Sequence, residues 1–414
     1  TGGINFIRNL KEENGKITFG TDFLLGNLKY DSYMFGYVFK PDQEILEANI
    51  NVENIDPFFN TSIVLENVKS NSNDNMGYNG QRGVFAAYVD YTYDLNNSLT
   101  FNIGLRSEYS TMSIISLTLD EENNNQKEHV FDDVDLFPAF NLKYKVSEYS
   151  NIRYAVSRTV TRPSFFEKTP AQLVPEPGQY TTAGTPTTKE TASINEPHLE
   201  NSYSINTDVK YELFPHPGEL VSLTLYGKII NEPIESVSIL KGGTDITYTF
   251  KNFSENAYAT GAEFEFKKRF SNLYSGLNTS YIYTLVNVPE EENENATRRP
   301  LQGASPYLVN ADIAYKFSYG GSDQFSTYFG IIFNIYGKRL YRVGVSGAGN
   351  QYELPFEAMD LVLKNEISKN IEINLSVENI LNAGHTIVQD VYEDPTRDQA
   401  TREVVIEEYF PGAV

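Results

Sequence analysis

The sequence contains no cysteine and no tryptophan, and it has only four histidines among 414 residues. Without cysteine the chain can form neither a disulfide nor a thiolate metal site, and redox chemistry gives no indication of its compartment. No stretch approaches the roughly 18 consecutive apolar residues that a membrane-spanning helix needs. These absences exclude a disulfide scaffold, a zinc-thiolate domain and a protein that crosses a membrane with helices.

Residues suited to catalysis are also scarce. The four histidines are scattered through expected loops and turns, without the spacing of a metalloprotease helix. The glycine-rich segment Gly344–Gly349 lacks the lysine and the following helix that phosphate binding requires, so we interpret it as a mobile loop. We predict no enzymatic activity, no cofactor and no metal. A phospholipase or protease with a Ser/His or Asp/His pair on the rim of a membrane barrel stays open as an alternative.

Positive charge is scarce as well, because 33 Lys and Arg stand against 55 Asp and Glu, a formal net charge of -22. A surface that binds nucleic-acid phosphates must be basic, so this balance argues against nucleic acid as a partner. Much of the acid falls in expected loops, such as Asp120–Glu122 and Glu290–Glu294, which is typical of a solvated rim. A funnel for cations and a divalent-ion bridge to anionic lipopolysaccharide are the alternatives.

What the chain has in abundance is alternation. In Ile371–Val377, IEINLSV, every second side chain is aliphatic, and Phe264 and Phe266 alternate with charged residues in the same way. A period of two places one set of side chains on each face of a strand. Since soluble sheets alternate too, the connections between the strands decide the fold class.

The connections are alternately short and long. The short ones are Asp94–Ser98, Val146–Ser150, Phe214–Glu219, Phe270–Tyr274, Tyr319–Gln324 and Ser368–Asn370. The long ones are Thr111–Leu136, Thr161–Asn201, Asn231–Ser254, Pro289–Ser305 and Lys338–Pro355. Outer-membrane barrels have short periplasmic turns and long extracellular loops. The sequence therefore predicts an all-β fold, a transmembrane antiparallel β-barrel.

We predict about sixteen strands in this chain, with boundaries uncertain by two to four residues. They are Gly2–Asn9, Lys16–Gly26, Asp31–Phe39, Glu44–Glu53, Arg82–Asp94, Ser98–Ser110, Phe137–Val146, Asn151–Val160, Ser202–Leu213, Leu220–Ile230, Glu255–Arg269, Tyr274–Val288, Pro306–Ser318, Gln324–Tyr336, Phe356–Ser368 and Asn370–Leu381. The longest connection, Thr161–Asn201, carries five prolines, which favour a semi-rigid extracellular cover that either captures a ligand or protects the barrel.

Several short motifs carry a family resemblance. Ser157–Phe165, SRTVTRPSF, resembles the S-x-T-x-x-R-P signature of TonB-dependent outer-membrane receptors, particularly the SusC-related and peptidase-regulatory-like types of Bacteroides-like bacteria. Further motifs of the family are similar to segments that follow in the right order across the chain. These segments are Gly104–Glu108 (GLRSE), Asn195–Asn206, Gly261–Glu263 (GAE), Arg299–Asn310 and Val377–Asn382 (VENILN).

The resemblance implies a barrel of about 22 strands closed around an N-terminal plug. The chain begins at Thr1, Asn382–Phe410 resembles the last extracellular loop, and Pro411-Gly412 resembles the lead into a final strand. We therefore expect residues 1–414 to be the outer-membrane β-barrel portion of a longer protein, whose plug, TonB box, first strands and last strand lie outside this chain.

Charged residues at alternate positions of the expected strands are predicted to project into the lumen. There they would pair across strands, contact the plug or line the ligand route. The Arg162-Pro163 pair is expected to end a strand, because proline cannot donate to the ladder. The lumen-facing candidates are Arg106, Glu108, Arg153, Asp208, Lys210, Glu263 and Glu265.

The resemblance also implies a function. It indicates an active receptor that imports a nutrient ligand such as a siderophore, glycan or peptide, using energy that the TonB complex transmits through the plug. Outer-membrane lipid, lipopolysaccharide and a surface lipoprotein are the other partners it suggests. A structural or secretion-associated barrel and a passive porin are the alternatives, and a plug with a TonB box would discriminate among them.

Overall fold

The structure is a computed structural model in which nearly every described element is a β-strand. It describes residues 1–10, 14–32, 35–39, 63–67, 76–119, 126–168, 172–173, 180–182, 199–241, 245–253, 255–288, 298–319, 325–345, 347–368, 370–392 and 402–410. Within these ranges the one helix is the four-residue α2 (Phe165–Lys168), so no helix there is long enough to cross a membrane. The predicted all-β fold class is confirmed.

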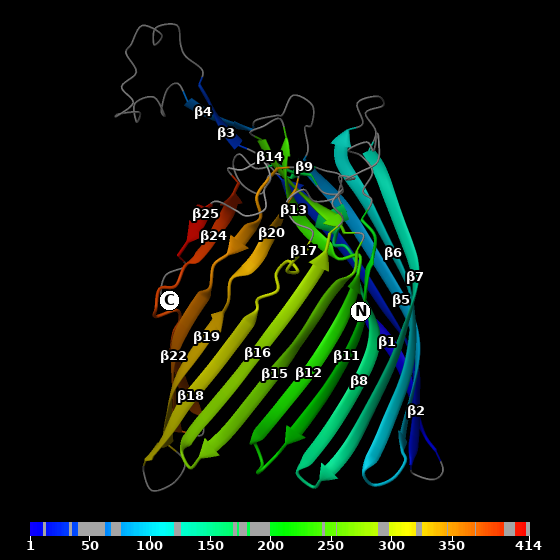
Figure 1. The fold of residues 1–414 in the computed structure, drawn as a ribbon, viewed down its shortest axis with the longest axis vertical. Coiled ribbons are helices and arrows are strands. Elements are labelled where there is room, and N and C mark those ends of the chain that lie inside the picture. Colours follow the sequence, from blue (N-terminus) through cyan, green and yellow to red (C-terminus); the bar gives the residue numbers. More distant parts are fainter. Residues whose placement is uncertain are drawn as a thin grey trace.

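Most strands belong to one large sheet, here called the main sheet, in which each strand pairs antiparallel with its neighbours in chain order. Figure 1 shows them side by side, running obliquely along a tall curved wall. The strands are β1 (Gly2–Asn9), β2 (Gly15–Ser32), β5 (Met76–Asp94), β6 (Leu99–Leu119), β7 (Gln126–Ser147), β8 (Ser150–Thr161), β11 (Ser202–Leu213), β12 (Leu220–Asn231), β15 (Ala257–Phe270), β16 (Leu273–Asn287), β18 (Tyr307–Tyr319), β19 (Phe325–Tyr336), β22 (Phe356–Ser368) and β23 (Ile371–Val377), with the short β17 (Arg298–Arg299) beside β16.

The register of the main sheet sorts its side chains onto two faces. Phe264 on β15 lies opposite Leu223 on β12, and Glu265 lies opposite Ser222. Leu223 is 46% exposed and such side chains recur at every second position, which gives a broad band of exposed apolar groups, here called the apolar face. The other side is the polar face. Because an exposed apolar band of this size is unfavourable in water, its natural environment is lipid.

Short turns join successive strand pairs at one end of the main sheet, and the longer connections lie at the other end (Figure 1). The turn between β5 and β6 shows why the short ones are tight: Asn96 Oδ1 accepts hydrogen bonds from the backbone N–H groups of Ser98 and Leu99. Such a side-chain turn reverses the chain within a few residues. The predicted alternation of short and long connections is confirmed except between β6 and β7, where only residues 120–125 separate the two strands.

A second sheet, built from the long connections, lies at the long-loop end (Figure 1). Most of its pairs are antiparallel, but β13 pairs with β20, and β10 with β14, in parallel. In spatial order its strands are β25 (Arg402–Tyr409), β24 (His385–Val391), β21 (Gln351–Glu353), β20 (Arg339–Val345), β13 (Ile234–Lys241), β14 (Asp245–Asn252), β10 (Tyr180–Thr182) and β9 (Gln172–Leu173). A separate hairpin pairs β3 (Phe35–Phe39) with β4 (Ile63–Asn67).

The second sheet packs on the polar face of the main sheet. Val237, Leu340 and Val343 from β13 and β20 share one buried core with Ala257 and Val286 from β15 and β16. Ala257 lies at the same parity as Glu263 and Glu265, which places it on the polar face. The connections that carry β13 and β20 therefore fold inward over the end of the wall.

Several strand and loop predictions were wrong. Asn231–Ser254, Lys338–Pro355 and the segment after Leu381 were predicted as loops, but they supply the second sheet. Much of Thr111–Leu136 is ladder between β6 and β7. The predicted strand Asp31–Phe39 is divided between β2 and β3, and Glu44–Glu53 lies outside the described residues.

The predicted mobile loop Gly344–Gly349 was also wrong for its described residues, which are packed. Asn350 Oδ1 accepts a hydrogen bond from the backbone N–H of Gly344. A Cβ on Gly349 would lie 1.9 Å from the carbonyl oxygen of Asp390, so only glycine fits there. These glycines allow two backbone segments to approach closely. Glycine content alone had indicated a mobile loop instead.

Candidate functional site

A chain of ion pairs crosses the polar face of β2, β6 and β7. Arg106 Nη1 lies 2.7 Å from Asp22 Oδ2, and Arg106 Nε lies 2.6 Å from Glu108 Oε1. Arg162 continues the chain, with Nη1 2.8 Å from Glu108 Oε2 and Nη2 2.6 Å from Asp135 Oδ2. Asp135 is 2% exposed, so this end of the network is shielded from water. Two of the sequence candidates, Arg106 and Glu108, thus belong to one network.

The signature segment that contains Arg162 ends β8 and starts α2. The backbone carbonyl of Pro163 accepts a hydrogen bond from Arg82. Ser164 Oγ accepts from the backbone N–H of Glu167 at 3.2 Å, and Glu167 Oε2 accepts from the N–H of Ser164 at 2.6 Å. This reciprocal pair is a capping box, which begins a helix where the strand cannot continue. Arg162-Pro163 therefore ends a strand, as the sequence predicts.

A second polar cluster lies between β8 and β11. Arg153 Nε donates to Glu212 Oε2 at 2.7 Å, and Lys210 Nζ lies 3.5 Å from Glu212 Oε1. Asp208 shares their face, opposite Ala155 on β8, and makes no ion pair among the described residues. The sequence missed Glu212, although its place two residues after Lys210 put it on the same face.

The remaining candidates line a cavity of about 210 Å³ beside this cluster. Glu263, Glu265 and Lys210 border it together with Ser222 and Asn278, and Glu265 Oε1 also lies 2.8 Å from Lys267 Nζ. The seven candidates lie in two groups on the polar face. Arg106 and Glu108 are on β6, and the other five lie around β8, β11 and β15. These groups suit contact with a polar segment or ligand inside a barrel.

The second sheet is fastened to β17 by a buried ion pair. Arg299 and Glu235 form two hydrogen bonds, Nη1 to Oε1 at 3.0 Å and Nη2 to Oε2 at 2.5 Å, and both side chains are 2% exposed. Glu235 Oε1 also accepts from the backbone N–H of Gln302, and the guanidinium lies 4.5 Å from the ring centre of Phe253. Such a bidentate pair holds two elements in one relative position.

A polar cluster around Glu353 joins β21 to the ends of β19 and β24. Glu353 accepts hydrogen bonds from Tyr336 Oη at 2.5 Å and Arg339 Nε at 2.7 Å, and its Oε1 lies 2.9 Å from His385 Nδ1. The ring of His385 stacks on Phe356 with centroids 4.3 Å apart. Burial raises the pKa of Glu353, but the hydrogen bonds from Tyr336, His385 and Arg339 outweigh it, so the pKa lies below its usual value.

The stability that Glu353 contributes should depend on pH. Because its folded-state pKa is lowered, this contribution is present above the unfolded value of 4.5 and is lost as pH falls through the folded pKa. We expect hydrogen exchange in β21, corrected for its chemical rate, to accelerate below about pH 4.5. Glu353→Gln should exchange faster at pH 7 and lose this acid dependence. The same acid dependence in both proteins would contradict the assignment.

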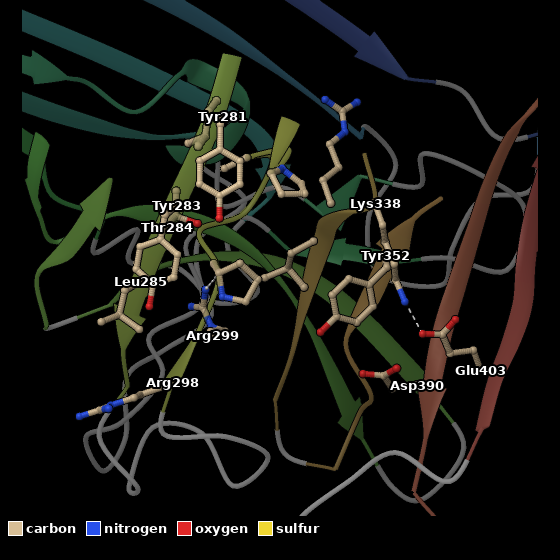
Figure 2. A pocket seen from close by; sticks show the side chains of 16 residues that line it. Tyr281, Tyr283, Thr284, Leu285, Arg298, Arg299, Lys338, Tyr352, Asp390 and Glu403 are labelled. Carbon is tan, nitrogen blue, oxygen red and sulfur yellow. Dashed lines mark hydrogen bonds and ion pairs between the residues drawn. The ribbon is translucent and has the colours of Figure 1, made fainter. Parts of the chain in front are cut away.

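A cavity of about 710 Å³ opens between the edge of β16 and the second sheet (Figure 2). Tyr281 and Tyr283 border one side, and Tyr352, Asp390 and Glu403 the other. Lys338 is ion-paired with Glu403, and its ammonium lies 4.5 Å from the ring centre of Tyr352. Aromatic rings beside paired charges suit a small polar ligand. No group of three potential metal ligands occurs in the described part of the chain.

The two faces, the alternating connections and the ion-paired polar side together define an outer-membrane β-barrel. The chain belongs to the family described as TonB dependent receptor-like, beta-barrel, whose model matches residues 4–380. In such a barrel the apolar face meets lipid, the polar face lines the lumen, and the short turns lie in the periplasm. No curated protein sequence matches the chain.

Solved receptors share the fold. The ferric yersiniabactin uptake receptor FyuA from Yersinia pestis is 12% identical with a TM-score of 0.59, and the match covers 97% of this chain and 51% of that one. The copper transporter OprC is 11% identical with a TM-score of 0.59, and the match covers 93% of this chain and 51% of that one. The ferric-catecholate import receptor Fiu from K12 E. coli is 13% identical with a TM-score of 0.57, and the match covers 90% of this chain and 48% of that one. The chain thus spans about half the length of these receptors.

Proposed function

We propose that the protein is a TonB-dependent receptor that imports a small nutrient ligand across the outer membrane, driven by energy from the inner membrane. The observation that carries this proposal is the second sheet, which packs on the lumen side of β15 and β16. A covered entrance suits a receptor that binds before it admits, whereas a passive porin needs an open channel. A purely structural barrel has no need of a second sheet packed on the lumen side of its wall.

The names of the solved receptors support a small ligand but do not identify it. Their names describe uptake of ferric yersiniabactin, copper and ferric catecholates, all small molecules or ions. The motif resemblance favours the SusC-related or peptidase-regulatory-like type, for which a glycan or peptide is the alternative cargo. In this proposal residues 1–414 form the barrel portion, while a plug, the TonB box and the remaining strands belong to other parts of the protein. Lipopolysaccharide and a surface lipoprotein are its proposed neighbours.

The test of this function is growth of the source bacterium on single nutrients. A strain without the gene should fail on one of a panel of siderophore-bound iron, cobalamin, oligosaccharides and peptides. The intact gene should restore growth, but not in a strain that also lacks TonB. Restored growth that does not need TonB would refute active import and favour a porin.

The capture role of the longest connection can be tested by deleting Gln172–Lys189. The deletion removes β9 and β10, and β10 pairs with Thr247 and Tyr248 of β14. These are edge strands of the second sheet, so the main sheet should still assemble and run as heat-modifiable protein. We expect weaker uptake of the nutrient that the growth panel identifies. A deletion of residues 121–125 is the control, and undiminished uptake after the Gln172–Lys189 deletion would indicate a protective loop.

A further inference from the structure

A cavity of about 540 Å³ lies above the end of β8. β8 stops at Thr161, whereas its neighbour β7 continues up to Gln126, so the upper edge of β7 has no β8 residue beside it. The helix α2 and the start of β11 border the opening that this leaves. The residues that line the cavity are Val130, Phe131, Asp132, Asp133, Lys168, Leu199, Glu200, Asn201, Tyr203 and Glu232.

Lys168 borders this cavity as a buried amine without an acceptor among the described residues. Its side chain is 6% exposed, and its Nζ lies 3.7 Å from the ring centre of Phe131. No hydrogen bond or ion pair joins the amine to another residue in the described ranges. Burial lowers the pKa of Lys168 to about 8, with Asp133 opposing the shift and Arg82 adding to it. A desolvated ammonium is costly unless it finds an acceptor, and a bound ligand can supply one.

The other charged groups of the cavity are all carboxylates. Asp133 Oδ2 accepts a hydrogen bond from Asn201 at 2.9 Å, while Glu200 and Glu232 have no ion-pair partner among the described residues. Burial raises the pKa of Glu232, and the nearby charge of Glu200 raises it further. A cation between these two carboxylates would relieve their repulsion. Since no three potential metal ligands converge in the described residues, an organic ammonium fits better than a metal ion.

We propose that this cavity binds a zwitterionic ligand, a basic amino acid or a short peptide, whose carboxylate accepts from Lys168 and whose ammonium lies between Glu200 and Glu232. Its volume falls within the usual range for small-molecule sites, about 300 to 1,000 Å³. With four carboxylates against one lysine, the cavity prefers a ligand with more positive than negative groups. This inference rests on the proposed import function and names its substrate class.

The test is calorimetric titration of the full-length receptor with the dipeptide lysylglycine, its C-terminal amide and its N-acetyl form, which is acetylated on both amino groups and has no ammonium. We expect the unmodified receptor to bind lysylglycine more tightly than either derivative. Lys168→Met should weaken binding of lysylglycine about tenfold or more but leave binding of the amide unchanged, because the amide offers Lys168 no carboxylate. Glu200→Gln should weaken binding of the free amine but not of the N-acetyl form. Lys145→Met, an exposed position near the short-turn end of β7, is the control and should change neither.

Two results would overturn the inference: no binding of lysylglycine at millimolar concentration, or equal affinities for Lys168→Met and the unmodified receptor. Heat-modifiability of each variant on gels shows whether its barrel is folded. The growth panel separates the two proposals. TonB-dependent growth on another nutrient, with no lysylglycine binding, removes this inference and keeps the import function. Growth that never depends on TonB removes the import function itself.

Discussion

Replacing Glu235 with alanine is expected to weaken the attachment of the second sheet by about 3 to 5 kcal/mol. The substitution leaves the guanidinium of Arg299 buried, at 2% exposure, without its carboxylate. Amide exchange in β13 and β20 should then become roughly a hundred-fold to several-thousand-fold faster, since each 1.4 kcal/mol is a factor of ten. Hydrogen exchange with mass spectrometry measures this directly, while the main sheet serves as an internal reference.

Two control variants make the result specific. Glu403→Gln breaks the Lys338–Glu403 pair in the same region, where the side chains are 37% and 42% exposed, and should cost at most about 1 kcal/mol. The double substitution Glu235→Met with Arg299→Met should recover most of the loss, because apolar groups of similar length replace the pair without leaving a buried charge. Equal effects of Glu235→Ala and Glu403→Gln would contradict the proposed fastening.

Arginine on the apolar face should cost about 2 to 4 kcal/mol near the bilayer midplane. Phe264 lies in the middle of β15 and Leu375 on β23, and Leu375 is 59% exposed to the surroundings that lipid would occupy. Phe264→Arg and Leu375→Arg should therefore lower the free energy of unfolding in lipid vesicles, measured by denaturant titration. An arginine there has no water or partner in the hydrocarbon.

The neighbouring residues supply the matched controls. Asn374 precedes Leu375 and lies opposite Lys364, on the polar face. Asn374→Arg should therefore be far milder than Leu375→Arg, although the introduced side chain is identical. Glu265→Gln should likewise cost less than Phe264→Arg. If both parities respond equally, the assignment of the two faces is wrong.

The main sheet could be predicted from the sequence because its signal is local. A period of two is visible within each run, and three predicted strands, Gly2–Asn9, Ser202–Leu213 and Phe356–Ser368, match the structure at both ends. Turn chemistry at short connections is equally local, as the hydrogen bonds of Asn96 illustrate. Register between strands then follows from the hairpins, so local patterns are enough to separate the two faces.

The second sheet could not be predicted in this way. β13 pairs with β20, and the hydrogen bond from Ser238 to Val343 spans 105 residues. Glu235 and Arg299 are 64 residues apart, so neither suggests the other in the sequence. A weak signal exists, because Ile234, Val237 and Ile239 are β-branched residues that favour strands. The turn residues that flank Ile234–Lys241 favoured a loop. Only pairing with distant strands decides between a loop and a strand in this segment.

The candidate site was predictable in type but not in detail. Alternation indicated which charged residues share a face, and the signature segment pointed to Arg162. The partners of Arg162, Glu108 and Asp135, come from β6 and β7, and no local pattern links them to it. The buried amine of Lys168 was missed because its environment is made by α2, β7 and β11 together.

Single-cysteine labelling on intact cells tests the central claim, which is that the chain forms an outer-membrane barrel with its second sheet on the extracellular side. The chain has no cysteine of its own, so each variant carries one thiol in this region. Glu255→Cys and Arg298→Cys at the long-loop end should react with a membrane-impermeant maleimide. Asn97→Cys and Glu148→Cys in the short turns should react only after the outer membrane is permeabilised. Equal labelling of all four on intact cells, or labelling of the short turns alone, would contradict the account.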